Sequence, residues 1–143
     1  MSAGVRSFAI ATRGPACHEI TRDIAGWLHE IGAGDGVLTV FLRHTSCSLL
    51  IQENADPDVQ RDLLCWLDRL APSADDPRMR WLTHRAEGPD DMPAHLKAAM
   101  LPVSLSIPVT GGAMSLGTWQ GIFLVEHRRA PHRRMIVAAF QPL

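Results

Sequence analysis

Hydrophobic and polar residues follow two different periods along the chain, and each period predicts one kind of element. Val103–Val109 (VSLSIPV) alternates cleanly between apolar and polar side chains, which is typical of a strand with one buried face. Segments rich in β-branched and apolar residues predict further strands. These are Arg6–Thr12, Val37–His44, Cys47–Gln52, two strands around the turn Gly117–Gly121, and a final strand over Arg133–Gln141.

Apolar residues at helical spacing predict two main helices and one short helix. The first begins near Thr21, which suits an N-cap, and places Ile24, Trp27, Leu28 and Ile31 on one stripe. The second follows Asp56, a capping residue, and Pro57, and it ends before Pro72. Its predicted buried face is Val59, Leu63, Trp66, Leu67 and Leu70. The short helix is MPAHLKAAML, with Pro93 at its start.

Strands therefore succeed one another like hairpins instead of alternating with helices. This order favours an α+β fold with largely antiparallel sheets in a sandwich-like arrangement, over a doubly wound parallel sheet. The 143 residues suit a single domain, 1–143, with a substantial core.

Composition narrows the classes of partner. The formal charge is −1, from 14 basic and 15 acidic residues. The chain has no excess of basic residues, so its charge does not favour nucleic acid as a partner. No apolar run approaches the ~20 residues of a membrane span. The N-terminus MSAGVRSFAI lacks the regions of a secretory signal, so we expect a cytoplasmic protein.

The three cysteines, Cys17, Cys47 and Cys65, show no CxxC spacing, which argues against a disulfide framework or a cysteine zinc site. Cys65 lies in the second predicted helix, and we expect it in the core. Cys47 follows the sequence HTS, where a reactive thiol is conceivable, but a buried packing residue is the favoured interpretation.

Four of the seven histidines have contexts that suggest a site. His44 ends a strand, His84 and His95 bracket the acidic segment HRAEGPDDMPAH, and His127 ends the apolar strand GIFLVEH. Three neutral imidazoles can hold a metal ion with an open position. The acidic residues that could complete or orient such a site are Glu53, Asp56, Glu87, Asp90 and Asp91. Structural, hydrogen-bonded histidines are an equally compatible interpretation.

Two further clusters carry polar groups. Asp56 is explained by helix capping, whereas Glu53 and Asn54 are free for substrate binding or acid–base work. In the Gly117–Gly121 turn, Trp119 suits stacking on a flat ring or packing at a subunit interface, although a plain hairpin turn is also compatible. The arginines that could receive a phosphate, or simply form a solvated edge, are Arg128, Arg129, Arg133 and Arg134.

Four segments in order, HTSCSLLIQENADPDVQRDL, EGPDDMPAHLKAAML, SLSIPVTGGAMSLGTWQGIFLVEHR and RRMIVAAF, resemble the YjbQ-like family, whose members are known as secondary thiamine-phosphate synthases. The resemblance covers about Phe8 to Phe140. Cys47 and Ser48 stand where many members carry Ala-Gly, a departure that bears on the pocket floor.

The resemblance implies an α+β homotrimer with a metal-associated histidine cluster. It also implies an activity that joins a pyrimidine diphosphate to a thiazole phosphate, so the expected ligand is a small phosphorylated molecule. A divalent metal, zinc first, is expected on His84, His95 and His127. The expected catalytic residues are Glu53, Asn54, Asp56, Glu87 and His44. The expected substrate contacts are Thr45, Ser46, Thr118, Trp119, Gln120 and Arg128. A metal-dependent hydrolase or phosphatase and a non-catalytic binding module are the alternatives.

Overall fold

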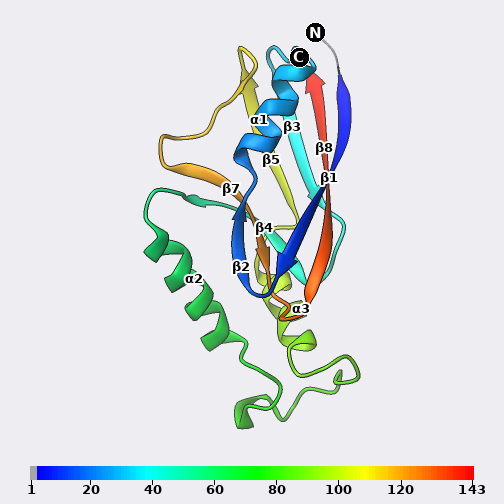
Figure 1. Ribbon diagram of the computed structural model, residues 1–143, viewed down its shortest axis with the longest axis vertical. Coiled ribbons are helices and arrows are strands. Elements are labelled where there is room, and N and C mark those ends of the chain that lie inside the picture. The colour runs from blue at the N-terminus through cyan, green and yellow to red at the C-terminus, as the bar shows by residue number, and fades with distance from the viewer. Residues whose placement is uncertain (1–2) are drawn as a thin grey trace.

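Two antiparallel sheets face each other in the computed structural model, which describes residues 3–143 (Figure 1). The strands are β1 (Gly4–Arg13), β2 (Ala16–Glu19), β3 (Gly36–Leu42), β4 (Cys47–Glu53), β5 (Ser104–Thr110), β6 (Ala113–Met114), β7 (Gln120–Glu126) and β8 (Pro131–Pro142). The helices are α1 (Thr21–Glu30), α2 (Pro57–Leu70) and α3 (Asp91–Met100), with a short 3₁₀ helix at Pro77–Met79.

The larger sheet has the order β1-β8-β3-β5-β6, and the smaller has the order β2-β7-β4. All the strand pairs in both sheets are antiparallel. The predicted α+β class with largely antiparallel sheets is therefore confirmed. One pairing differs from the expectation: β6 pairs with β5, whereas β7 lies in the other sheet, so the Gly117–Gly121 turn connects the two sheets.

The main core lies between the sheets and α1. Alternate residues of β3, Leu38, Val40 and Leu42, are almost completely buried there, as strand periodicity requires. The α1 stripe packs against them through Ile24, Trp27 and Leu28, and Ile31 packs at its border.

Helix α2 covers the outer face of the smaller sheet, where Leu67 packs with Phe123 and Val125 (Figure 1). Its predicted buried face is only partly correct. Trp66 is 53% exposed and Leu70 is 49% exposed, because α2 touches the sheet along a narrow line. Cys65 is also exposed, which corrects its assignment to the core.

The outer face of the larger sheet carries small and apolar side chains that remain exposed or half-buried. On this face Val5 is 72% exposed and Phe41 is 46% exposed, while Val37, Val137 and Ala139 are half-buried or exposed. Among residues 3–143, no helix is long and apolar enough to cross a membrane.

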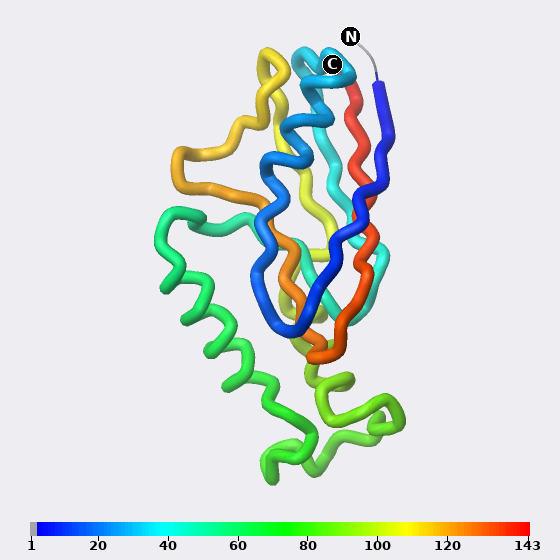
Figure 2. Tube along the Cα trace, viewed as in Figure 1, coloured from blue at the N-terminus to red at the C-terminus, as the bar shows by residue number. Residues whose placement is uncertain are grey.

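The segment between α2 and α3 lies beyond one end of the sheets (Figure 2). It packs on α3 through a small separate cluster of Ala74, Met79 and Leu82, bordered by Met92 and Leu96. Arg85 stabilises the segment by donating to the carbonyls of Leu82, Ala74 and Met79. This segment and α3 together position the polar residues described next.

Candidate functional site

Four potential metal ligands meet where the segment between α2 and α3 folds onto α3. His84 and Glu87 come from the segment, and Asp91 and His95 stand one helical turn apart on α3. One ligand atom from each residue lies within 4.8 Å of the others. Asp91 Oδ2 lies 2.7 Å from His84 Nε2 and 3.2 Å from His95 Nε2. These four residues could together hold a metal ion, and on that ground we call them the metal centre.

The hydrogen bond of His95 shows how its ring is oriented. His95 Nδ1 lies 2.8 Å from the Thr45 carbonyl oxygen. Because a carbonyl only accepts, Nδ1 carries a proton, so in the neutral form of the ring it is Nε2 that presents a lone pair to the centre. A metal-bound histidine typically has this arrangement, in which a backbone carbonyl fixes the tautomer. The donor set of two imidazoles and two carboxylates fits zinc and related divalent ions.

Arg128 holds the acidic side of the centre. Its guanidinium donates to Asp91 Oδ1 at 2.6 Å, to Asp90 Oδ2 at 3.0 Å and to the Glu87 carbonyl at 3.1 Å. Burial by itself raises the pKa of Asp91, but hydrogen bonds and nearby positive charges outweigh it and hold the pKa below its usual value. Arg128 was expected to contact substrate, but all three of its nitrogens are engaged within the protein, so it is a positioning residue.

His127 does not join His84 and His95, which corrects the expected ligand set. Its side chain is 3% exposed, and its Nε2 lies 2.8 Å from Ser48 Oγ. Strand alternation directs it to the side of the sheet that α2 covers, with Phe123 and Val125. Burial lowers the pKa of His127 to about 4, with further lowering by the Lys97 charge. Asp91 and Glu87 accompany the two remaining histidines instead.

A second group of ionisable residues, Glu126 and Arg134, is fully buried between the sheets. Arg134 Nε donates to Glu126 Oε1 at 2.7 Å and its Nη2 donates to Oε2 at 2.5 Å. Thr12 Oγ1 and the backbone N–H groups of His127 and Arg128 complete the shell of the carboxylate. Arg134 is therefore a core residue, and its assignment to a solvated or phosphate-binding edge was wrong. Ser46, an expected substrate contact, accepts from Arg134 at 3.0 Å.

A shallow cavity of about 340 Å³ adjoins the metal centre and is lined by His44, Thr45, Cys47 and His95. His44 Nε2 accepts the backbone N–H of Met135 at 2.8 Å, and burial lowers the pKa of the ring. His44 is thus held neutral beside the cavity. Burial raises the pKa of the Cys47 thiol to about 12, so the packing interpretation of Cys47 holds over the reactive one.

The structure places Glu53, Asn54 and Asp56 at the opposite end of β4 from Cys47. The strand has seven residues, which corresponds to roughly 20 Å. Asp56 caps α2 by accepting the Asp58 N–H, Glu53 accepts the Asp56 N–H, and Asn54 donates to Glu19. Within one chain these residues lie away from the metal centre and stabilise a helix start, which corrects their expected grouping with His44 and Glu87.

The Gly117–Gly121 turn lies beside them, because Glu53 pairs with Gln120. Gln120 Oε1 accepts the Gly117 N–H at 2.8 Å and closes the turn. Thr118 and Trp119 are exposed, with Trp119 at 63%. These three expected substrate contacts therefore form a surface turn in the single chain.

Sequence reasoning missed the ion pair between the buried Lys97 of α3 and the exposed Asp68 of α2, which lies beside His127. The signal available was weak, because a single charged residue on a predicted helix is ordinarily exposed to solvent. Arg134 had a clearer signal. It shares the alternating face of Ile136, Ala138 and Phe140, which are all buried.

The comparisons with known proteins agree on one family. The family model described as "UPF0047 protein YjbQ-like" matches residues 6–142. A UPF0047 protein of Synechocystis sp. is 48% identical over 128 residues, which cover 90% of this chain and 84% of that protein. The UPF0047 protein YjbQ of Escherichia coli O157:H7 is 36% identical and covers 95% of this chain and 96% of its own.

Solved structures show the same fold. A YjbQ/UPF0047 family protein from Clostridium acetobutylicum has a TM-score of 0.84 at 33% identity and covers 95% of this chain and 99% of its own. A hypothetical protein from Aeropyrum pernix K1 has a TM-score of 0.86 at 27% identity and covers 98% and 99% of the two chains.

These findings correct the expected function. The family model and the relatives are named by family alone, and none of these names states an enzymatic activity. The thiamine-phosphate synthase activity that the resemblance implied is therefore withdrawn, and the residues themselves must carry any functional assignment. The long match, the identities and the shared fold establish the family itself: the chain belongs to the YjbQ-like UPF0047 family.

Proposed function

We propose that this protein binds a divalent metal ion, with zinc as the first candidate, through His84, Glu87, Asp91 and His95. The observation that carries the proposal is the convergence of four ligand atoms within 4.8 Å, with His95 Nε2 and Asp91 Oδ2 only 3.2 Å apart. Two lone pairs at this distance repel each other unless a cation or a proton lies between them. A divalent ion satisfies all four groups together.

We propose further that the centre is catalytic in type and that the protein is an enzyme. A structural zinc site usually supplies the folding energy of a small domain and is closed by four buried ligands. Here three hydrophobic clusters stabilise the chain without the centre. The side chains of His84 and Glu87 are 45% and 66% exposed. A bound divalent ion would act as a Lewis acid on a ligand oxygen.

The cavity lined by His44, Thr45 and His95 is the proposed binding site for the substrate, and a small phosphorylated molecule is the proposed class. The cavity shares His95 with the centre, so a ligand in it lies beside the ion. His44 is fixed by the Met135 N–H, so its other ring nitrogen carries the proton and can donate to an anionic oxygen.

Metal content by mass spectrometry on untagged protein tests the proposal. We expect about one zinc per chain in the wild type and almost none in His95→Ala or Asp91→Ala. His29→Ala is the matched control, because His29 is exposed on α1 and outside the centre, and it should keep the metal. His127→Gln should also keep it, because His127 binds Ser48.

Folded wild type that takes up no zinc, manganese or cobalt on addition would refute the metal site. Zinc that is lost from His127→Gln but kept by His95→Ala would restore His127 as a ligand in place of the proposed set. A metal-loaded protein that converts none of a panel of small phosphate compounds would remove the catalytic part of the proposal and leave metal binding.

We also propose that the chain self-associates through the outer face of the larger sheet, as the homotrimer implied by the family resemblance. The support is the exposed apolar surface around Val5, Phe41 and Val137, since monomers rarely leave such a contiguous face uncovered. Light scattering should give three chains per particle for the wild type and one for Val137→Lys. Glu30→Lys on α1 is the matched control and should remain a trimer; a monomeric wild type would contradict the proposal.

A further inference from the structure

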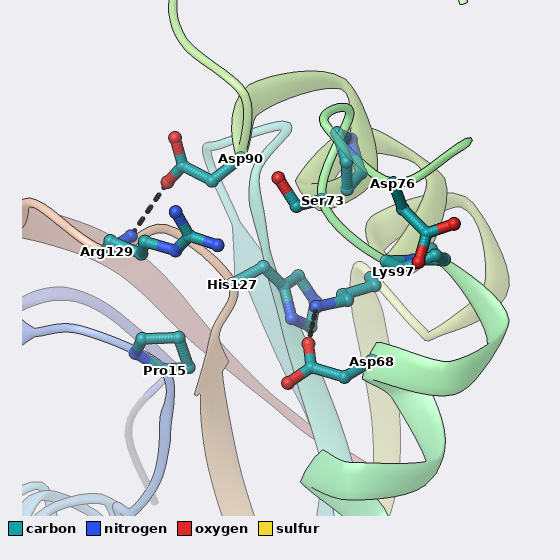
Figure 3. A pocket seen from close by; sticks show the side chains of 11 residues that line it. Pro15, Asp68, Ser73, Asp76, Asp90, Lys97, His127 and Arg129 are labelled. Carbon is teal, nitrogen blue, oxygen red and sulfur yellow. Dashed lines mark hydrogen bonds and ion pairs between the residues drawn. The ribbon is translucent and has the colours of Figure 1, made fainter. Parts of the chain in front are cut away.

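A second cavity, of about 310 Å³, lies on the opposite side of α3 from the metal centre. Successive residues of a helix are rotated by about 100°, so Pro93 and Lys97 point roughly opposite to Asp91 and His95. Lys97 and Pro93 line this cavity together with His127, Arg129 and Asp68 (Figure 3). The cavity therefore has its own set of side chains and shares no ligand with the metal centre.

Two polar side chains of this cavity are more than nine-tenths buried. His127 is 3% exposed and Lys97 is 6% exposed. His127 Nε2 is bonded to Ser48, but among residues 3–143 its Nδ1 has no partner. In this part of the chain, His18 Nε2 is the one side-chain N or O atom that is both fully enclosed and without a hydrogen bond. Because His127 Nδ1 also lacks a hydrogen bond but is not enclosed in this way, it is open to the cavity that the ring lines. Figure 3 shows the ring between Lys97 and Arg129.

The acidic residues of the cavity are already engaged. Asp68 pairs with Lys97, and Asp76 uses both carboxylate oxygens on Arg78. Asp90 Oδ2 accepts from Arg128 and from the Arg129 backbone N–H.

The groups left over are donors. Lys97 has three N–H bonds and uses one for Asp68. The Arg129 guanidinium has no hydrogen-bond or ion-pair partner among the described residues and lines the cavity. A buried ammonium, a free guanidinium and an open imidazole nitrogen together suit a ligand that carries negative charge and accepts hydrogen bonds.

We propose that this cavity is a binding site for a small organic anion, recognised through a phosphate or carboxylate group by Arg129, Lys97 and His127. The volume lies at the lower end of the range for small-molecule pockets, about 300–1,000 Å³, and so limits the ligand to the size of a small metabolite. Pro15, Ala71 and Pro72 add apolar walls for its carbon skeleton. The proposal does not depend on metal binding at the other face of α3.

Calorimetric titration of the full chain with inorganic phosphate and, separately, with succinate tests the site. We expect saturable binding of one or both probes, weakened roughly tenfold or more in Arg129→Gln. Arg133→Gln is the matched control, since Arg133 is exposed on the neighbouring strand, does not line the cavity and carries the same charge. The nitrogen resonances of His127 should shift on binding in the wild type.

The same titration in His84→Ala separates this site from the metal centre. Unchanged anion binding in His84→Ala supports the cavity, whereas loss in His84→Ala together with full binding in Arg129→Gln would place the anion on the metal and overturn the proposal. If Arg129→Gln and Arg133→Gln weaken anion binding equally, the binding reflects general charge attraction and the proposed site is overturned. No saturable binding of either probe would also overturn it.

Discussion

The metal centre and the buried pair of Glu126 and Arg134 are both built from ionisable residues. They differ in the supply of hydrogen-bond donors to their carboxylates. Around Glu126, two nitrogens of Arg134, one hydroxyl and two backbone N–H groups point at two carboxylate oxygens. At the metal centre, His95 Nε2 and Asp91 Oδ2 lie 3.2 Å apart, and in the neutral form of His95 both atoms are acceptors. The first arrangement is complete within the protein, and the second is completed only by a cation or a proton.

Burial or charge alone does not reveal this difference, because Asp91 and Glu126 are both almost inaccessible. Burial tends to raise the pKa of both carboxyl groups, and their hydrogen-bonding partners lower it further than burial raises it. The useful distinction is whether the atoms that face each other are donor and acceptor, as around Glu126, or two acceptors. A cluster in which acceptors outnumber donors is a candidate site for a cation.

The largest expected effect is on stability, from Arg134→Met. This change leaves the Glu126 carboxylate buried without its cation, so we expect the free energy of unfolding to fall by about 3–5 kcal/mol. Urea denaturation measures it. Arg133→Met, one residue away and exposed, should change stability by less than about 0.5 kcal/mol. An equal effect of both variants would show that the buried pair is not the stabilising network described here.

The next effect concerns His127 and acid. Its pKa is about 4 in the folded chain against 6.5 for the free group, so the unfolded chain takes up a proton first as the pH falls. The neutral ring therefore makes its whole contribution to the free energy of unfolding above pH 6.5. This contribution, about 3 kcal/mol at most, is lost as the pH falls from 6.5 to 4.

His127→Gln, which can still bond Ser48, should flatten the stability curve over this interval. Denaturation at pH 7, 6, 5 and 4 measures the difference. The neighbouring charges, Lys97, Glu126, Arg134 and Asp68, remain in both proteins, so the comparison isolates the ring. Parallel curves for the two proteins would contradict the buried neutral imidazole.

Arg128 links the two regions, and its replacement should act on the metal without removing a ligand. In Arg128→Met, Asp91 loses the donor that orients it, so we expect zinc affinity to fall about ten- to a hundredfold. Competition with a zinc-binding dye on the folded protein measures this. Arg129→Met is the control and should retain wild-type affinity. Unchanged affinity in Arg128→Met would mean that Asp91 is positioned without it.

The smallest expected effect is at the start of α2. Asp56→Ala removes the cap on the Asp58 N–H and should lower stability by about 1 kcal/mol without changing metal content. Asp62→Ala, exposed within the same helix, is the control and should be nearly neutral. Loss of zinc in Asp56→Ala would show that this end of β4 reaches a metal centre after all, for example across a subunit boundary.

The fold was largely predictable because local patterns agree with the tertiary structure. The alternation in β5 and the α1 stripe of Ile24, Trp27 and Leu28 appear in the structure as buried faces. What local pattern could not supply was the assignment of β6 and β7 to different sheets, since that depends on long-range pairing. The exposure of Trp66 and Cys65 was missed for the same reason: α2 has only one narrow contact with the sheet.

For the candidate site, the sequence identified residue types better than it identified neighbours. His84, Glu87, Asp91 and His95 lie close in sequence, so the segment already suggested that they meet. His127 is far along the chain, and strand alternation alone did not show which side of the sheet faces the centre. Glu53 shared a motif with His44, yet a whole strand separates the two, and the turn of Trp119 lies at the Glu53 end of that strand.

The alternating directions of residues 126–129 limit where sequences of this family can gain or lose residues. Glu126 faces the inter-sheet core, His127 and Arg129 face the anion cavity, and Arg128 faces the metal centre. Deleting or inserting one residue here would exchange all of these environments at once. The segment between α2 and α3, by contrast, carries its ligands outside the sheets. We expect natural variation in chain length to accumulate in that segment and to be absent from the end of β7.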